Sequence, residues 1–285
     1  MLTSVLLAAL ATVKITVQGY FSRGRIKTGK DSLMLNGSIF ASVAIVMAIL
    51  FLRELPSVQV FWYAVPMAVA ALCFQLFYML AMKAGPISLS VAIASFNFLV
   101  PTIFGIVLYD ESINLEGVMA IVLLGTAIVL INHRGKVDQC EKHWLLLAIL
   151  ACTFSGLSNS VTMMFSRSLY AEQKEQLVIF GNAIASILSF GAASFMKNGE
   201  EHGFYMDKKL SLGLTVIGGA LGIYSLLMVE GLSKTSNSGL FLSVLNVLTL
   251  VFCTLFDGIV FKQKLNRYQW AGILVSMAAI VIANI

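Results

Sequence analysis

Charged residues are scarce in this 285-residue chain: Asp, Glu, Lys and Arg together make up 12% of it, whereas hydrophobic residues make up 59%. A soluble domain carries about twice that share of charge. Because a membrane-spanning helix needs about 20 mostly apolar residues, this composition predicts an all-α integral membrane protein without a separate soluble domain. The net charge of +5 comes from basic residues between the apolar runs, where membrane proteins keep them, so it does not indicate a nucleic-acid partner.

Residue patterns typical of enzymes are absent as well. The sequence has no H-E-x-x-H metal site and no glycine-rich phosphate loop. Its three histidines cannot be grouped with Ser and Asp, or with Cys, at one depth of the membrane. We therefore expect no enzyme, no ATP-driven motor, no metal and no cofactor. The four cysteines are expected to pack rather than to form disulfides, since three lie inside apolar runs and Cys140 lies in a polar connection.

Ten apolar runs, each bounded by charged or turn residues, predict ten transmembrane helices. They cover residues 2–21, 33–52, 58–82, 87–108, 115–132, 143–166, 176–196, 210–230, 236–257 and 267–285. The first run exceeds the length of a signal-peptide core, so we expect it to remain as the first helix. Pro66 and Pro101 fall within the third and fourth runs, where a hinge and a static kink are both compatible with the sequence.

The two halves of the chain, residues 1–134 and 143–285, resemble each other. Residues 21–23 (FSR) recur as 165–167, and at the same offset of 144 residues GSIFAS (37–42) matches GNAIAS (181–186). Two later blocks match at an offset of 152. Four matches in register predict two copies of a five-helix unit. Because five is odd, the second copy enters the membrane from the other side, which gives an inverted repeat of the kind that supports alternating access.

Three short segments of the first half carry a family resemblance. AMKAGPIS (81–88), Pro101 and DESI (110–113) are similar to a recurring pattern of the drug/metabolite transporter superfamily, EamA-type branch. A weaker second copy is GLSKTSNS (231–238). The resemblance implies ten helices in two halves and a substrate pathway among helices one, three, four, six, eight and nine. The chain departs from the family pattern at Gln263, where a glutamate is expected, and it lacks the acidic residue that the superfamily's small multidrug exporters carry in helix one.

One charged side chain lies well inside an apolar run. Lys14 falls about a turn past the middle of the first helix, and Gln18 lies one turn further on the same face. A buried charge in the membrane is a candidate functional site, and Lys14 is suited to bind a substrate carboxylate or phosphate. The alternatives are a lysine that extends to the interface or an ion-pair partner for Glu230 or Asp257.

Neutral polar residues recur at helical spacing in several runs. In the sixth run Ser155, Ser158, Asn159 and Thr162 lie on one stripe. Asn97 and Asn246 fall at nearly equivalent positions of the two repeats. Each residue alone is explained by interhelical hydrogen bonding, whereas the set together predicts a cavity. The predicted substrate-binding residues are Lys14, Gln18, Gln75, Tyr78, Asn97, Ser155, Asn159, Tyr224 and Asn246.

Three acidic residues are expected to have roles other than direct substrate binding. Glu230 and Asp257 lie near helix ends and are the candidates for proton coupling, the alternative being a solvated helix terminus. Glu111 is expected to shape the turn before the fifth helix rather than to contact substrate.

Small residues at four-residue spacing, such as Gly218 and Gly222, predict close helix packing, with dimerisation as the alternative. Monomer and homodimer both stay open.

Loop charges and the family resemblance disagree about orientation. Most of the 19 basic residues, including Arg23 and Arg25, lie in loops that the positive-inside rule places in the cytoplasm, which puts both termini outside. The resemblance implies the reverse orientation, with both termini in the cytoplasm.

We also expect a multi-pass protein of the cell membrane, with a bacterial plasma membrane favoured.

The sequence therefore predicts a secondary transporter that moves a small polar metabolite by alternating access. An amino acid or another carboxylated solute is favoured because of Lys14. The expected partners are this small-molecule substrate and the lipid bilayer. The alternatives are a proton-coupled exporter of lipophilic drugs and a membrane receptor or assembly protein that does not transport.

Overall fold

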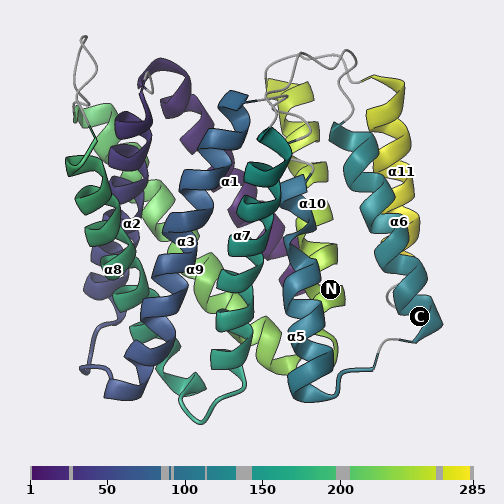
Figure 1. The fold of residues 1–285 in the computed structure, drawn as a ribbon, viewed down its shortest axis with the longest axis horizontal. Coiled ribbons are helices and arrows are strands. Elements are labelled where there is room, and N and C mark those ends of the chain that lie inside the picture. The colour runs from purple at the N-terminus through teal and green to yellow at the C-terminus, as the bar shows by residue number, and fades with distance from the viewer. Residues whose placement is uncertain are drawn as a thin grey trace. The chain divides into compact units, whose positions relative to one another are not determined.

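The computed structural model describes residues 2–25, 28–84, 90, 93–112, 114–132, 143–196, 206–260 and 266–282, and these residues are almost entirely helical (Figure 1). The helices in this part of the chain are α1 (Leu2–Arg25), α2 (Gly29–Phe51), α3 (Val58–Ala84), η1 (Phe96–Phe98), α5 (Leu99–Tyr109), α6 (Leu115–Asn132), α7 (Trp144–Ser166), η2 (Ala171–Gln173), α8 (Lys174–Ser194), α9 (Lys208–Lys234), α10 (Ser238–Val260) and α11 (Arg267–Ile282). Each of the ten predicted runs contains one described α-helix. Cys140 and the connection 133–142 lie outside the described residues.

The length and surface of these helices are those of a multi-pass membrane protein. Six described spans are long and apolar enough to cross a membrane, and three shorter helices are also apolar. Large apolar side chains are exposed on several of them, with Ile49 and Trp62 each 78% exposed. Exposure of this kind is costly in water but favourable against lipid tails.

Short polar side chains cap the N-termini of several helices at the breaks between apolar runs. At the start of α2, the Thr28 hydroxyl accepts from the Asp31 backbone N–H, and Asp31 Oδ2 accepts from the Thr28 backbone N–H at 2.9 Å. This capping box satisfies backbone groups that a helix end leaves unpaired. It also explains why α2 begins at Gly29 rather than at Leu33, where the apolar run begins: the first turn is polar. Asn or Asp side chains cap four further helices, namely Asn114, Asp207, Asn237 and Asn266.

The chain forms two compact units, each built from both sequence halves. Unit 1 consists of 1–9, 77–160 and 234–285, and unit 2 consists of 10–76 and 161–233. The units of contact therefore differ from the sequence halves 1–134 and 143–285, and the division into repeats stays a prediction.

Within unit 1, α6 packs along α11, and α10 packs against η1, α5, α6 and α11 (Figure 1). α6 and α11 come close together at Gly272, where the contact leaves no room for a side chain: an added Cβ would lie 2.7 Å from Ile131 Cγ1. A glycine at such a contact lets two helix backbones approach each other.

Within unit 2, α2 packs along α8 over most of its length (Figure 1). Gly37 of α2 lies against the Phe190 ring, and the Gly37 carbonyl accepts a 2.9 Å hydrogen bond from Ser186 Oγ. On α9, Gly218 and Gly222 lie against α2. The predicted small-residue faces are therefore used for packing inside this unit.

Candidate substrate-binding site

The predicted fourth helix is not regular, and Pro101 explains why. In an α-helix the N–H of residue 101 would donate to the Asn97 carbonyl, but proline has no N–H and its ring collides with that carbonyl. The chain forms the 3-10 helix η1 just before α5, and the Leu99 N–H donates to the Phe96 carbonyl three residues back. The Ser95 carbonyl, which an α-helical Leu99 would have used, is thereby available to another donor.

Three of the predicted residues meet at this irregular segment of unit 1. Asn246 Nδ2 on α10 donates to Asn97 Oδ1 at 2.8 Å and to the Ser95 carbonyl at 3.2 Å. Asn97 Nδ2 in turn donates to Ser155 Oγ on α7 at 2.8 Å. All of these side chains are half-buried. We call Asn97, Ser155 and Asn246 the amide cluster.

Gly156 allows α7 to lie close to the amide cluster. A Cβ at Gly156 would lie 2.6 Å from the Asn97 carbonyl oxygen and 2.6 Å from Val100 Cβ. Such distances are far inside normal contact, so only glycine fits without moving a backbone. The side chain of the preceding residue, Ser155, can therefore reach Asn97.

The amide cluster keeps polar groups that its own hydrogen bonds do not use. Asn246 Nδ2 uses its two hydrogens on Asn97 Oδ1 and the Ser95 carbonyl, which leaves Asn246 Oδ1 as an acceptor and the Ser155 hydroxyl as a donor. Asn159 lies one turn beyond Ser155 on α7, and its side chain has no hydrogen-bond partner within the described residues. The site is therefore neutral and offers both donors and acceptors to a ligand.

The other predicted neutral residues with described side chains lie on α3 and α9. Gln75 Oε1 on α3 accepts from Asn36 Nδ2 on α2 at 3.4 Å, and both residues belong to unit 2. Tyr78, further along α3, is half-buried in unit 1, and Tyr224 is half-buried on α9 in unit 2. Asn36, only 4% exposed, is a partner that the sequence analysis missed.

Lys14 lies half-buried on α1 in unit 2. Gln18 belongs to the same helix, but its side chain lies outside the described part of the chain, as does that of Asp257 on α10. The roles of these three residues stay predictions.

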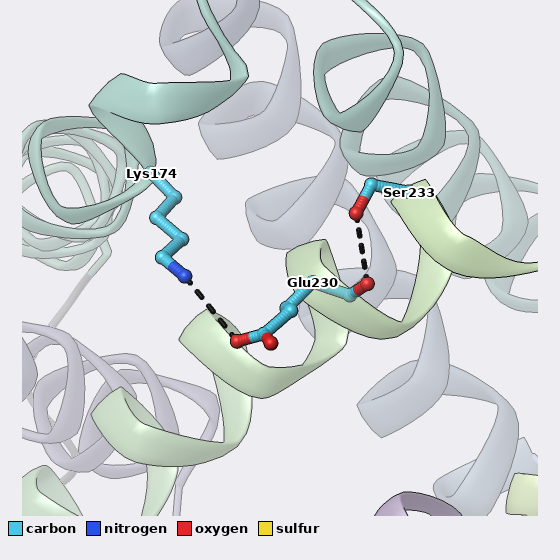
Figure 2. A network of polar contacts seen from close by, with 3 residues as sticks. All are labelled: Lys174, Glu230 and Ser233. Carbon is cyan, nitrogen blue, oxygen red and sulfur yellow. Dashed lines mark hydrogen bonds and ion pairs between the residues drawn. The ribbon is translucent and has the colours of Figure 1, made fainter.

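Glu230 forms an ion pair within unit 2. Its Oε2 atom lies 3.3 Å from Lys174 Nζ, which comes from the first turn of α8 (Figure 2). The two side chains are 40% and 29% exposed, respectively. The Glu230 carbonyl also accepts from Ser233 Oγ at 2.8 Å near the end of α9. In the structure this carboxylate is thus balanced by Lys174 close to a helix end.

Glu111 has a partner that the sequence analysis did not foresee. It lies in the connection between α5 and α6, but its carboxylate accepts two hydrogen bonds from Ser238 at the start of α10. The expectation that Glu111 shapes the turn before the fifth helix rather than contacting substrate did not include this bond to α10. The available signal was the polar pair Asn237-Ser238 at the start of the predicted run 236–257, which marks a helix start that favours negative charge.

The fold and the apolar helices define a multi-pass α-helical membrane protein. The model of the EamA-like transporter family matches residues 142–285, which is half of the chain. The chain belongs to this family of membrane transporters. Its sequence resemblance to the drug/metabolite transporter superfamily is thereby confirmed.

Solved structures share the fold. Among 29 matching chains, one crystal structure of a protein is 14% identical and has a TM-score of 0.78, with 98% of this chain and 96% of that chain covered. At this identity the likeness concerns the fold alone. No curated protein matches the chain.

Proposed function

We propose that this protein is a secondary transporter that moves a small polar metabolite across the membrane by alternating access. The observation that carries the proposal is the amide cluster: in a chain of a transporter family, Asn97, Ser155 and Asn246 gather neutral polar groups inside a helical unit. Polar groups are costly inside a membrane unless they serve a pathway or pair with one another. Here pairing accounts for only part of their hydrogen-bonding capacity.

The predicted inverted repeat supports alternating access. Helices α2 and α8 occupy corresponding places in the two five-helix halves, as do α6 and α11, and each of these pairs packs side by side. Asn97 and Asn246, which lie at nearly equivalent sequence positions, are hydrogen-bonded to each other. This pairing of equivalent parts is expected where an axis of pseudo-symmetry passes between them.

The substrate class that we favour is an amino acid or another carboxylated metabolite. Lys14 is suited to be the counter-charge for a carboxylate, and the neutral donors and acceptors of the amide cluster are suited to a polar solute. A solute gradient or exchange drives this transport. The alternative is proton-coupled drug export; of its two candidate residues, Glu230 forms an ion pair with Lys174, and the Asp257 side chain lies outside the described residues.

Ligand-induced thermal stabilisation of the purified protein tests the proposal. A bound ligand stabilises by RT ln(1 + [L]/Kd), so a panel of amino acids, organic acids, sugar phosphates, nucleosides and lipophilic cations identifies the class. We expect a carboxylated metabolite to stabilise the wild type and the Lys208→Ala variant, which loses an exposed lysine, but not Lys14→Ala. Flux of that compound into proteoliposomes then separates a carrier from a receptor.

Two results would contradict the proposal in different ways. Stabilisation by lipophilic cations alone would favour the drug exporter and leave Lys14 without a substrate role. Binding of a metabolite without flux in proteoliposomes would favour a receptor.

A further inference from the structure

Glu111 and Ser238 join the end of α5 to the start of α10 within unit 1. Glu111 Oε1 accepts from Ser238 Oγ at 2.8 Å, and Glu111 Oε2 accepts from the Ser238 backbone N–H at 3.0 Å. Glu111 is 9% exposed and Ser238 is fully buried. Hydrogen bonds to a charged acceptor are stronger than neutral ones, and the N-terminus of a helix favours a negative charge. We call these two bonds the Glu111–Ser238 link.

The Glu111 side of the link is fixed to α5. Asp110 adopts a left-handed conformation with φ of 51°, which turns the chain back at the end of α5, and the Glu111 N–H donates to the Gly105 carbonyl at 3.1 Å. The carboxylate itself lies over Gly105, where an added Cβ would collide with it. The carboxylate therefore has a defined place on α5 that depends on a glycine.

The Ser238 side of the link is fixed to α10. Asn237 caps this helix by accepting from the Leu240 N–H at 2.9 Å. Gly239 lies directly against Thr102 of α5, where an added Cβ would collide with the threonine side chain. The start of α10 and the first turn of α5 are thus in close contact at Gly239 and Thr102.

The link and the amide cluster are a similar number of residues apart on α10 and on the η1–α5 segment. Asn246 lies eight residues after Ser238, and Asn97 lies eight residues before Gly105. At 1.5 Å per residue, eight residues of α-helix span about 12 Å. A slip of α10 by one turn would move Asn246 about 5.4 Å from Asn97, too far for the observed bond.

We propose that Glu111 is a positioning residue, which sets the register of α10 against α5 and so holds Asn246 on Asn97. The carboxylate does this from outside the amide cluster, through the rigid helix that begins at Ser238. The inference concerns the geometry of the cluster and rests on the proposed function only for its consequence in substrate binding.

A double-mutant cycle on thermal stability tests the inference without any ligand. We compare Glu111→Gln, Asn246→Ala and the double variant in detergent. We expect Glu111→Gln to lower Tm by about 10 °C, because it removes the charge from two bonds. Residues this far apart without a shared partner normally give additive effects. If the link sets the register, Asn246→Ala lowers Tm by less than half as much in the Glu111→Gln background as in the wild type.

The neighbouring carboxylate provides the matched control. Asp110→Asn removes the same charge one residue away, at an exposed position, and asparagine tolerates the left-handed conformation. We expect it to leave Tm unchanged and its effect to add to that of Asn246→Ala. Should Glu111→Gln not fold, Ser238→Ala removes one bond of the link and enters the same cycle.

Additive effects of Asn246→Ala with both Glu111→Gln and Ser238→Ala would overturn the inference, since the link would then stabilise only its own end of the helices. This outcome is independent of transport. A protein that shows coupling in the cycle but no ligand in the stabilisation panel would retain the positioning role and lose the proposed function.

Discussion

Replacing Asn246 by alanine removes the part of the amide cluster that α10 contributes. The side chain donates one bond of 2.8 Å and one of 3.2 Å. Side-chain hydrogen bonds between helices in membranes contribute about 0.6 kcal/mol on average and up to about 1.7 kcal/mol. The two bonds together therefore stabilise the fold by about 1 to 3 kcal/mol. The variant should fold, with Tm lowered by a few degrees.

The same substitution should also weaken substrate binding. Under the proposed function, Asn246→Ala removes one contact to substrate and one hydrogen bond to Asn97, and a loss of about 1.4 kcal/mol weakens binding about tenfold. The assay is the concentration dependence of ligand-induced stabilisation, followed by flux in proteoliposomes. Ser243→Ala is the control, because this fully buried hydroxyl donates only to the Leu240 carbonyl of its own helix.

An Asn246→Ala protein that loses a few degrees of Tm but binds substrate within about twofold of the wild type would refute the reasoning. The amide cluster would then be a packing contact between α10 and the η1–α5 segment. Weakened binding in both Asn246→Ala and Ser243→Ala would instead point to a general disturbance of α10.

Three further predictions concern other contacts. Gly218→Ala should lower Tm by several degrees, because an added methyl would meet the α2 backbone at 2.8 Å, whereas Gly219→Ala, which faces open space, should leave Tm unchanged or raise it slightly; equal effects would contradict the packing of α9. In a double-mutant cycle, Lys174→Gln and Glu230→Gln should show a coupling of about 1 kcal/mol or less that shrinks in high salt, since both side chains are partly exposed. Gly156→Ala should reduce both Tm and substrate affinity, because its methyl would lie 2.6 Å from the Asn97 carbonyl oxygen. Unchanged affinity would mean that substrate binding does not depend on this close contact.

Much of the fold could be predicted from the sequence because each helix satisfies its own backbone. In lipid a span must pair its N–H and C=O groups internally, so apolar runs and polar breaks are sufficient to locate helices. The run 115–132 became α6 with the same bounds, and the run 143–166 became α7 one residue shorter. Larger differences occur at polar helix ends, such as the capped first turn of α2 and the last turn of α9, and in the fourth run, where α5 begins at Leu99.

The site could be predicted only as a set of polar residues, because hydrogen-bond partners belong to different helices. Asn97, Ser155 and Asn246 were predicted together, and the structure joins them by direct bonds. Gln75, from the same set, instead pairs with Asn36, which has no distinguishing pattern in the sequence. Spacing along a helix defines the face of a side chain, but not the residue that it meets.

The sequence by itself determined the membrane class, the helix positions and the family, because these depend on local composition and on short patterns along the chain. The tertiary structure alone decided that Glu111 bonds to Ser238, 127 residues away, and that Glu230 is paired with Lys174. It also decided that the irregular turn before Pro101 offers the Ser95 carbonyl to Asn246. These contacts depend on which helices lie next to each other and at what register, and in a chain so uniformly apolar that information is not present in any single segment.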